Sequence, residues 1–343
     1  IADADVLFNG AGFQFTTSAA PGLFDVQDVA THELGHFLGL DHTGFAGATM
    51  YPYVDPAVIL HRSPSRDEVG GLRDAYPDGS FGAVRGRVLR LADGTPVAGA
   101  HVVARDAAGR TAGAALADAG GTFRVRGLDP GTYVLLATPL DQPVSDANLG
   151  EGNTVVVDFA STELAAGVVV ATSQVELGDV FVDADTPLAL GRNTDEFPLY
   201  AQRGSALVFS LAGTGLVNGS TLESSDPDLT VTPLAWLGTA VTFGLTIPAG
   251  EEPGHADLLV TDGSGERSLL PGAIEIVPVE PTVTQASPSL GSISGGTAVT
   301  ITGGGFRAGA RVVLGREVYV DGDVDGCTVV DAGTITLTTR ATP

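Results

Sequence analysis

The sequence reads HELGHFLGLDH from His32 to His42. On a helix, side chains four positions apart lie one turn apart on the same face, so His32 and His36 can reach one metal ion. Gly39 can adopt the left-handed conformation that ends a helix, which lets the chain turn back and bring His42 as a third ligand. Three histidine ligands and one open coordination position are typical of a catalytic zinc site, whereas a structural zinc site normally has four protein ligands.

Glu33 follows the first histidine of this stretch. A glutamate at this place in H-E-x-x-H is the expected proton acceptor for a water activated at the metal. We therefore predict that His32, His36 and His42 bind Zn²⁺ and that Glu33 is the catalytic general base. The reaction that these residues predict is hydrolysis of a peptide bond.

The residues around this stretch predict two helices. Apolar residues follow helical spacing from Val26, and Asp25 before them is a good N-cap, which predicts a helix over Val26–Leu38. A second helix is predicted over Arg66–Ala75, because Ser65 and Glu68 form a capping-box pair. The histidine pair therefore lies in the second half of the first helix.

The motif carries a family resemblance. HELGHFLGLDHT, followed by ATMYPY from Ala48, resembles the zinc site and Met-turn of metzincin metallopeptidases, most closely the matrixin branch. His42 and Met50 are separated by a spacing similar to that of matrixins. The resemblance covers residues 1–79 and implies the C-terminal part of a matrixin catalytic domain. It also implies that Met50 forms a hydrophobic floor beneath the metal.

Two positions depart from the family pattern. A short strand is predicted over Asp5–Asn9, and it aligns with a matrixin strand in which animal members carry a structural-zinc histidine. This chain has Leu7 at that place. Val54 stands where the tyrosine of the family's pocket wall is expected, with Tyr53 one place earlier. The resemblance therefore implies a catalytic zinc, but it implies neither a second zinc nor a preference for particular substrate side chains.

From Phe81 the periodicity of apolar residues changes to two, and Gly, Asp and Pro mark the turns. This pattern predicts strands with one solvated face, on which the arginines of residues 81–139 alternate with apolar residues. Gly86-Arg87-Val88 and the stretch from Leu128 to Tyr133 resemble a carboxypeptidase-regulatory-like, transthyretin-like β-sandwich.

An internal repeat follows. Residues 210–216 and 300–306 both read as an alternating strand that ends in a glycine turn. The chain from Pro281 resembles an IPT/TIG immunoglobulin-like domain, and the earlier copy is a weaker match to the same family. The predicted fold class is multidomain, with a partial α+β metzincin catalytic domain followed by all-β sandwich modules. The predicted domains are the peptidase part at 1–79, the carboxypeptidase-regulatory-like sandwich at 80–186, an Ig-like (IPT/TIG-like) sandwich at 187–279 and a truncated IPT/TIG domain at 280–343.

Charge and composition narrow the function classes. The net charge of −24 disfavours binding to nucleic acid or to an anionic membrane surface. The single cysteine, Cys327, cannot form an intramolecular disulfide. No apolar run approaches the roughly 18 residues that span a bilayer. The sequence begins at Ile1 without a leader, so we expect that it starts inside a longer protein, secreted or on the surface of a bacterial cell.

Other candidate metal ligands are weaker. Residues 321–326 resemble the first half of a calcium loop, but an EF-hand needs a glutamate at the twelfth position, where this chain has Ala332. An acidic hairpin turn is the preferred interpretation, and Ca²⁺ is not supported. His61, His101 and His255 lack ligand spacing and are interpreted as ordinary surface or strand residues.

Two hypotheses for function follow. The first is a secreted zinc-dependent endopeptidase that acts on a protein or peptide substrate. Its β-modules would space the peptidase or dock it onto a cell-surface or matrix polymer. The alternative is a non-enzymatic cell-surface or adhesion protein in which the zinc site is vestigial or structural. Only the histidine motif carries recognisable chemistry, and function resides in sites rather than in folds, so the first hypothesis is preferred.

Overall fold

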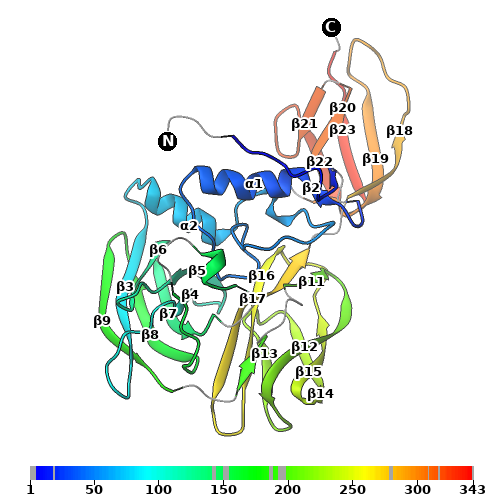
Figure 1. The fold of residues 1–343 in the computed structure, drawn as a ribbon. Coiled ribbons are helices and arrows are strands. Elements are labelled where there is room, and N and C mark those ends of the chain that lie inside the picture. The colour runs from blue at the N-terminus through cyan, green and yellow to red at the C-terminus, as the bar shows by residue number, and fades with distance from the viewer. Residues whose placement is uncertain are drawn as a thin grey trace. The chain divides into compact units, whose positions relative to one another are not determined.

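The chain divides into two compact units, residues 1–277 and 278–343. A computed structural model describes residues 5–17, 20–140, 144–149, 154–184, 188–191, 198–277, 281–307, 309–315 and 317–341 (Figure 1). The predicted boundaries after residues 186 and 279 lie outside these ranges, and the division into four domains stays a prediction. An N-terminal α+β region with two helices is followed by several all-β modules. Within the described ranges, no helix is long and apolar enough to cross a membrane.

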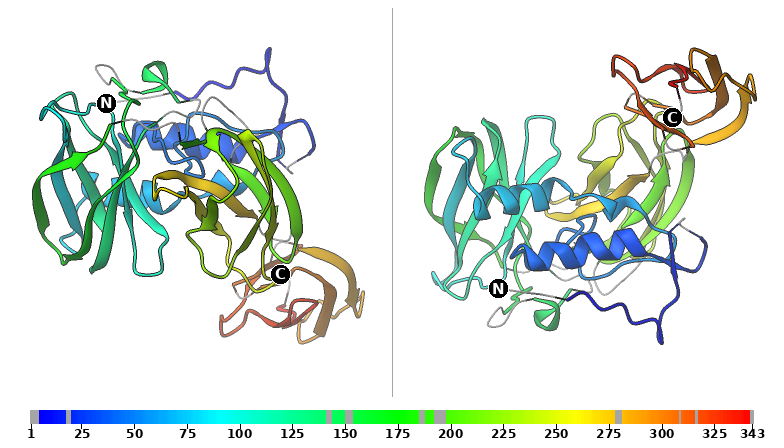
Figure 2. Two further views of the ribbon diagram at one scale, coloured as in Figure 1. Left: turned by 90° about the horizontal axis from the view of Figure 1, so that it is seen from below. Right: turned by 90° about the horizontal axis from the view of Figure 1, so that it is seen from above.

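The N-terminal region contains both α-helices. Its elements are β1 (Phe15–Thr16), β2 (Phe24–Asp25), α1 (Val26–Phe37), the 3-10 helix η1 (Leu60–Arg62) and α2 (Arg66–Ala75). Asp25 caps α1, since its Oδ1 accepts from the backbone N–H of Gln27 and Asp28 at 3.1 and 3.0 Å. Ser65 and Glu68 form the capping box of α2. Both predicted helices and their caps are confirmed, and α1 ends one residue early. Figure 2 shows the two helices on the same side of unit 1.

The prediction of a strand over Asp5–Asn9 is wrong, because this segment is irregular. Leu7 is 91% exposed, and Phe8 packs edge-on against Phe15, with ring centroids 5.2 Å apart. A strand needs a neighbour that takes up its backbone hydrogen bonds. No such neighbour is found for this segment among the residues that the structure describes.

The first β-sandwich follows the N-terminal region. Its elements are β3 (Gly82–Arg90), β4 (His101–Arg105), β5 (Thr111–Leu116), β6 (Thr122–Leu128), β7 (Gly131–Thr138), the 3-10 helix η2 (Asp146–Asn148), β8 (Thr162–Val170) and β9 (Gln174–Val182). The sheets have the orders β6-β3-β9 and β5-β4-β7-β8. Val84, Val88, Phe123 and Val125 are buried in the core between them, as the alternation predicts.

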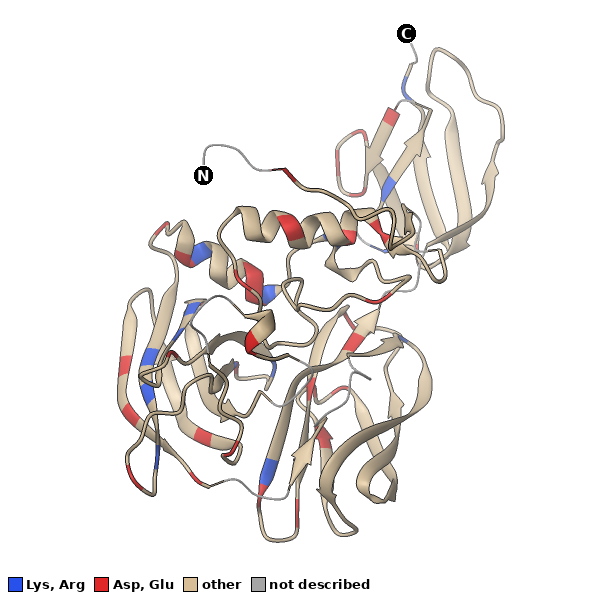
Figure 3. Cartoon of the chain, in the orientation of Figure 1, with Lys and Arg blue, Asp and Glu red and all other residues tan. Residues whose placement is uncertain are grey.

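The alternating arginines do more than face water. Arg124 and Arg126 on β6 both form ion pairs with Asp74 on α2, with N···O distances of 2.9 and 2.7 Å. Arg87 on β3 pairs with Asp179 on β9 at 3.0 Å. Figure 3 shows the basic residues of the chain in blue and the acidic residues, which outnumber them, in red. Arg124 and Arg126 therefore tie the helical region to the first sandwich, and Arg87 joins two strands within it.

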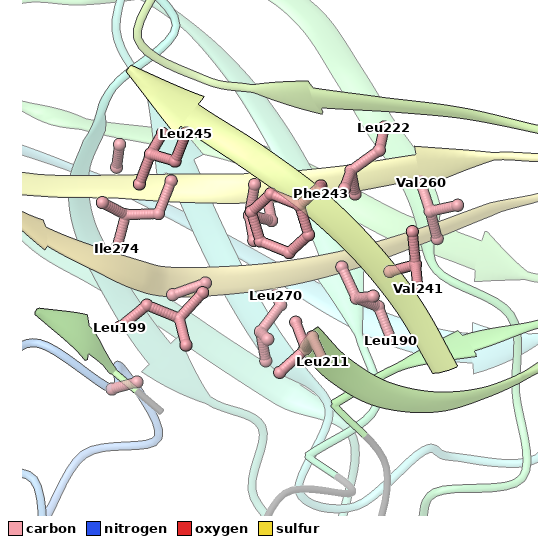
Figure 4. Packing of buried hydrophobic residues seen from close by; sticks show 14 of the residues in the cluster. Leu190, Leu199, Leu211, Leu222, Val241, Phe243, Leu245, Val260, Leu270 and Ile274 are labelled. Atoms are coloured by element: carbon pink, nitrogen blue, oxygen red, sulfur yellow. The ribbon is translucent and has the colours of Figure 1, made fainter. Parts of the chain in front are cut away.

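The second β-sandwich completes unit 1. Its strands are β10 (Ala189–Leu190), β11 (Leu199–Gln202), β12 (Ala206–Leu216), β13 (Thr221–Ser224), β14 (Thr230–Trp236), β15 (Gly238–Thr246), β16 (Gly254–Thr261) and β17 (Arg267–Val277). The sheet β10-β12-β15-β14 faces the sheet β11-β17-β16-β13 across a core that contains Leu211, Phe243 and Ile274 (Figure 4). Ala46 and Tyr51 of the N-terminal region belong to the same buried cluster.

Unit 2 is a small all-β body. Its strands are β18 (Thr282–Ser287), β19 (Ala298–Gly304), β20 (Arg311–Leu314), β21 (Glu317–Val320), β22 (Cys327–Asp331) and β23 (Thr334–Thr338). The acidic stretch 321–326 is not a hairpin turn, because β21 and β22 belong to different sheets. The Asp321 carboxylate accepts from the backbone N–H of Val329 at 2.9 Å and of Gly309 at 3.0 Å. The first acid of this stretch therefore shapes the loop.

Candidate metal centre

Three histidines converge in the N-terminal region. His42 Nε2 lies 3.3 Å from His32 Nε2 and 3.2 Å from His36 Nε2. Nitrogens bound tetrahedrally to one zinc at about 2.0–2.1 Å lie roughly 3.3 Å apart. Both distances therefore fit nitrogens bound to one zinc ion, and all three ligand atoms lie within 4.8 Å of one another.

The local sequence explains how the third histidine arrives. His32 and His36 lie one turn apart on α1, which ends with Leu38 as its C-cap. Gly39 has a φ of 95°, the left-handed conformation predicted for it, and the Leu40 N–H donates to the Gly35 carbonyl at 3.0 Å. The chain thereby reverses within a few residues and returns His42 to the helix face.

The Nδ1 of each ring, here called its outer nitrogen, forms a hydrogen bond with a backbone oxygen. His32 Nδ1 donates to Thr49 O at 2.7 Å, and His36 Nδ1 donates to Leu40 O at 3.0 Å. His42 Nδ1 donates to Asn148 O. A carbonyl oxygen can only accept, so each neutral ring carries its proton on Nδ1 and turns an Nε2 lone pair toward the other two.

Burial favours the neutral form of His32. It lowers the pKa of His32, the hydrogen bond with Thr49 opposes this effect, and the neighbouring His36 and His42 lower the pKa further. Metal binding requires a neutral imidazole. The surroundings of His32 therefore favour the form that can bind a metal.

Met50 lies beneath the histidine pair and is 2% exposed. A Cβ added at Gly35, between the two helical histidines, would overlap the Met50 sulfur, so the helix and the methionine are in close contact. Glu68 Oε1 accepts from the Met50 N–H at 2.9 Å, and Glu68 Oε2 accepts from the Ser65 N–H at 2.8 Å. The capping-box glutamate of α2 therefore also holds the turn that carries Met50.

Glu33 is half-buried beside His32. Both residues line a cavity of about 130 Å³, whose wall also includes Tyr53 and Val54. In the part of the chain that the structure describes, no group donates a hydrogen bond to the Glu33 carboxylate. Its roles in proton transfer, and those of the three histidines as ligands, stay predictions.

One of the remaining histidines, His61, differs from the sequence interpretation. His61 is not a surface residue, since it is 5% exposed and its Nδ1 lies 3.2 Å from Asp28 Oδ2. Glu275 lies between His61 and His255, with N···O distances of 3.8 and 3.7 Å. His101 is a strand residue, as expected, but it is fully buried, and burial lowers its pKa to about 4. The sequence contains no signal for this burial, because the partners of these residues lie far along the chain.

Family models match three regions of the chain. Residues 3–77 match Matrixin, residues 83–162 match the carboxypeptidase regulatory-like domain, and residues 281–343 match the IPT/TIG domain. Metalloendoproteinase 1 of Glycine max is 36% identical over 74 residues, which are 22% of this chain and 24% of that protein. The chain thus matches about a quarter of the length of this curated relative.

Solved structures match at low similarity. One is the Bacteroides ovatus mixed-linkage glucan utilization locus protein SGBP-B in complex with a mixed-linkage heptasaccharide. It is 13% identical with a TM-score of 0.22, covering 75% of this chain and 57% of that chain. BcpA, the major pilin subunit of Bacillus cereus, is 13% identical with a TM-score of 0.19, covering 76% of this chain and 85% of that chain. Scores this low support no inference about function.

The family models and the histidine geometry agree on the N-terminal region. The chain contains a matrixin region at residues 3–77, in which His32, His36 and His42 resemble the matrixin zinc-binding motif, followed by a carboxypeptidase regulatory-like domain and an IPT/TIG domain.

Proposed function

We propose that the matrixin region is the metal-binding part of a zinc-dependent endopeptidase that hydrolyses peptide bonds. The observation that carries this proposal is the convergence of three Nε2 atoms, from His32, His36 and His42, at the spacing of zinc ligands. The match to the matrixin family supports a peptide as the substrate class.

The number of ligands favours catalysis over a structural role. Among the described residues, the group that contains His32, His36 and His42 has no fourth His, Cys, Asp or Glu. A structural zinc site normally has four protein ligands, whereas a catalytic site keeps one position open. When bound, zinc supplies Lewis acidity that polarises a carbonyl and lowers the pKa of water.

Glu33 performs the proton transfer in this proposal. Its carboxylate accepts a proton from the attacking water and then delivers that proton to the leaving amine. A positioned general base typically contributes about 10² to 10⁴ in rate. The cavity of about 130 Å³ beside Glu33 and His32 would receive one side chain of the substrate.

The β-modules have an accessory role in this proposal. We propose that they act as spacers for the peptidase or dock it onto a cell-surface or matrix polymer. The protein would then act outside the cell, either secreted or on the cell surface. The net charge of −24 is compatible with that setting and disfavours a nucleic-acid partner.

The test is peptide cleavage by full-length protein with Glu33→Gln, which keeps the size of the side chain and removes the base. We expect the variant to bind as much zinc as the wild type and to lose about 10² to 10⁴ in cleavage rate. Glu266→Gln, at an exposed position, is the matched control and should cleave normally. Unchanged cleavage by Glu33→Gln at equal zinc content would reject Glu33 as the base. Zinc binding without any cleavage by the wild type would favour the non-enzymatic alternative.

A further inference from the structure

The outer nitrogens of the three histidines have partners of two kinds. Those of His32 and His36 meet carbonyls that lie 17 and 4 residues away, within the matrixin region. The partner of His42 lies 106 residues away. It is the backbone oxygen of Asn148, at the end of η2, which belongs to the polypeptide of the first sandwich.

The turn that presents this oxygen is held by its own side chains. Asn148 Oδ1 accepts from the Ser145 N–H at 3.0 Å and from the Ser145 hydroxyl at 3.1 Å. Asp146 Oδ1 accepts from the Val155 N–H at 2.8 Å, which ties the turn to the segment that follows it. The position of the Asn148 carbonyl is therefore fixed by hydrogen bonds among Ser145, Asp146, Asn148 and Val155.

The same turn is packed against the matrixin region. The Tyr53 hydroxyl donates to Asn148 Oδ1 at 3.4 Å. Leu149, the residue that follows η2, belongs to one buried cluster together with Ala46 and Tyr51. The contacts of Asn148 and Leu149 thus hold the turn against the matrixin region, where the Asn148 carbonyl accepts from His42.

A histidine that binds a metal almost always donates its second ring N–H to a carbonyl or carboxylate, and loss of such a partner typically costs about 10-fold to 100-fold in metal affinity. We propose that the Asn148 turn is a positioning element for His42, so that the metal affinity of the matrixin region depends on a segment of the neighbouring β-module. This inference rests on the zinc site of the proposed function.

The proposal makes Asn148 a positioning residue, since its side chain holds the turn while its main chain contacts His42. Asn148→Ala removes the side-chain oxygen that accepts hydrogen bonds from Ser145 and Tyr53, yet it leaves the backbone carbonyl that accepts from His42. The expected effect is therefore near the lower end of the range, a rise of about 10-fold in the dissociation constant for zinc. Asn148→Asp keeps an acceptor oxygen at the same place and should bind zinc nearly as the wild type does.

The experiment measures zinc affinity of the full chain by competition with a chromophoric chelator, and the visible absorption of the cobalt-substituted protein. Asn9→Ala is the matched control, because Asn9 Oδ1 also accepts a local hydrogen bond, from the Gly12 N–H at 3.1 Å, in an exposed loop. Circular dichroism verifies that each variant is folded. A loosened His42 should alter the cobalt spectrum of Asn148→Ala, and the Asn9→Ala spectrum should match that of the wild type.

Weaker zinc binding by Asn148→Ala, with near wild-type binding by Asn148→Asp and Asn9→Ala, supports the proposal. Equal zinc affinity and equal cobalt spectra for the wild type and Asn148→Ala overturn it while leaving the zinc site itself intact. A wild type that binds no zinc overturns both this inference and the proposed function. If Asn148→Ala does not fold, Ser145→Ala removes only the hydroxyl donor, and zinc binding equal to that of the wild type would then contradict the proposal.

Discussion

Glu68 Oε1 accepts a hydrogen bond from the backbone N–H of Met50 at 2.9 Å. The other carboxylate oxygen accepts from the Ser65 N–H and closes the capping box of α2. One buried side chain therefore connects the start of α2 to the turn beneath the histidines. The stability of that turn and the capping of the helix should change together.

Glu68→Ala should lower the free energy of unfolding by about 1–3 kcal/mol, because it leaves the buried Met50 N–H without an acceptor. Urea denaturation of the full chain measures this change. Ser65→Ala, which removes only the capping hydroxyl, should cost about 0.5–2 kcal/mol. A loss within about 0.5 kcal/mol for Glu68→Ala, the range of ordinary surface substitutions, would contradict the connecting role.

Gly35→Ala should destabilise the protein, although alanine is the better helix former by about 1 kcal/mol. The added Cβ would overlap the Met50 sulfur, and overpacking of this kind typically costs about 1–3 kcal/mol. The penalty should shrink when Gly35→Ala is combined with Met50→Ala, which removes the sulfur. Urea denaturation of the two single variants and the double variant gives the coupling free energy between the two positions. A Gly35→Ala variant that is more stable than the wild type would refute the close contact.

The free energy of unfolding should fall as the pH rises from about 6.5 to about 8. Burial lowers the pKa of His61, but its interaction with Asp28, chiefly the side-chain hydrogen bond, opposes this effect, and the pKa lies above its usual value. Burial raises the pKa of Glu275 to about 8. In this window the folded protein holds protons that the unfolded chain releases, so a rising pH favours unfolding.

His255 acts in the opposite direction, but only at lower pH. Burial lowers its pKa to about 4, so below about pH 6.5 the unfolded chain binds a proton that the folded protein lacks. The test is urea denaturation across this pH range with a chelator present, so that zinc binding does not contribute. Glu275→Gln should flatten the decline above about pH 6.5. An equally steep decline in this variant would exclude Glu275 as a source of it.

The sequence predicts the histidine triad because its geometry is local. A helical repeat places His32 and His36 on one face, and a glycine with positive φ returns His42 to that face, all within eleven residues. The capping pairs are local for the same reason. Such features need no knowledge of the rest of the fold.

Features that depend on distant partners were not predictable. The Asn148 carbonyl reaches His42 from 106 residues away and leaves no pattern in the sequence. His61 and Glu275 meet because the second sandwich packs against the N-terminal region. The Asp5–Asn9 prediction failed for the converse reason, since a short apolar run forms a strand only where another strand can pair with it.

The most direct test of the account is a zinc titration of the metal-free full-length protein, followed by peptide cleavage. The account predicts that cleavage appears with added zinc and reaches its plateau at one zinc per chain. It also predicts that Glu33→Gln binds the same single zinc but cleaves about 10² to 10⁴ times more slowly, and that His36→Ala binds zinc far more weakly. Cleavage that persists without zinc, or zinc binding that is unchanged in His36→Ala, would contradict the account.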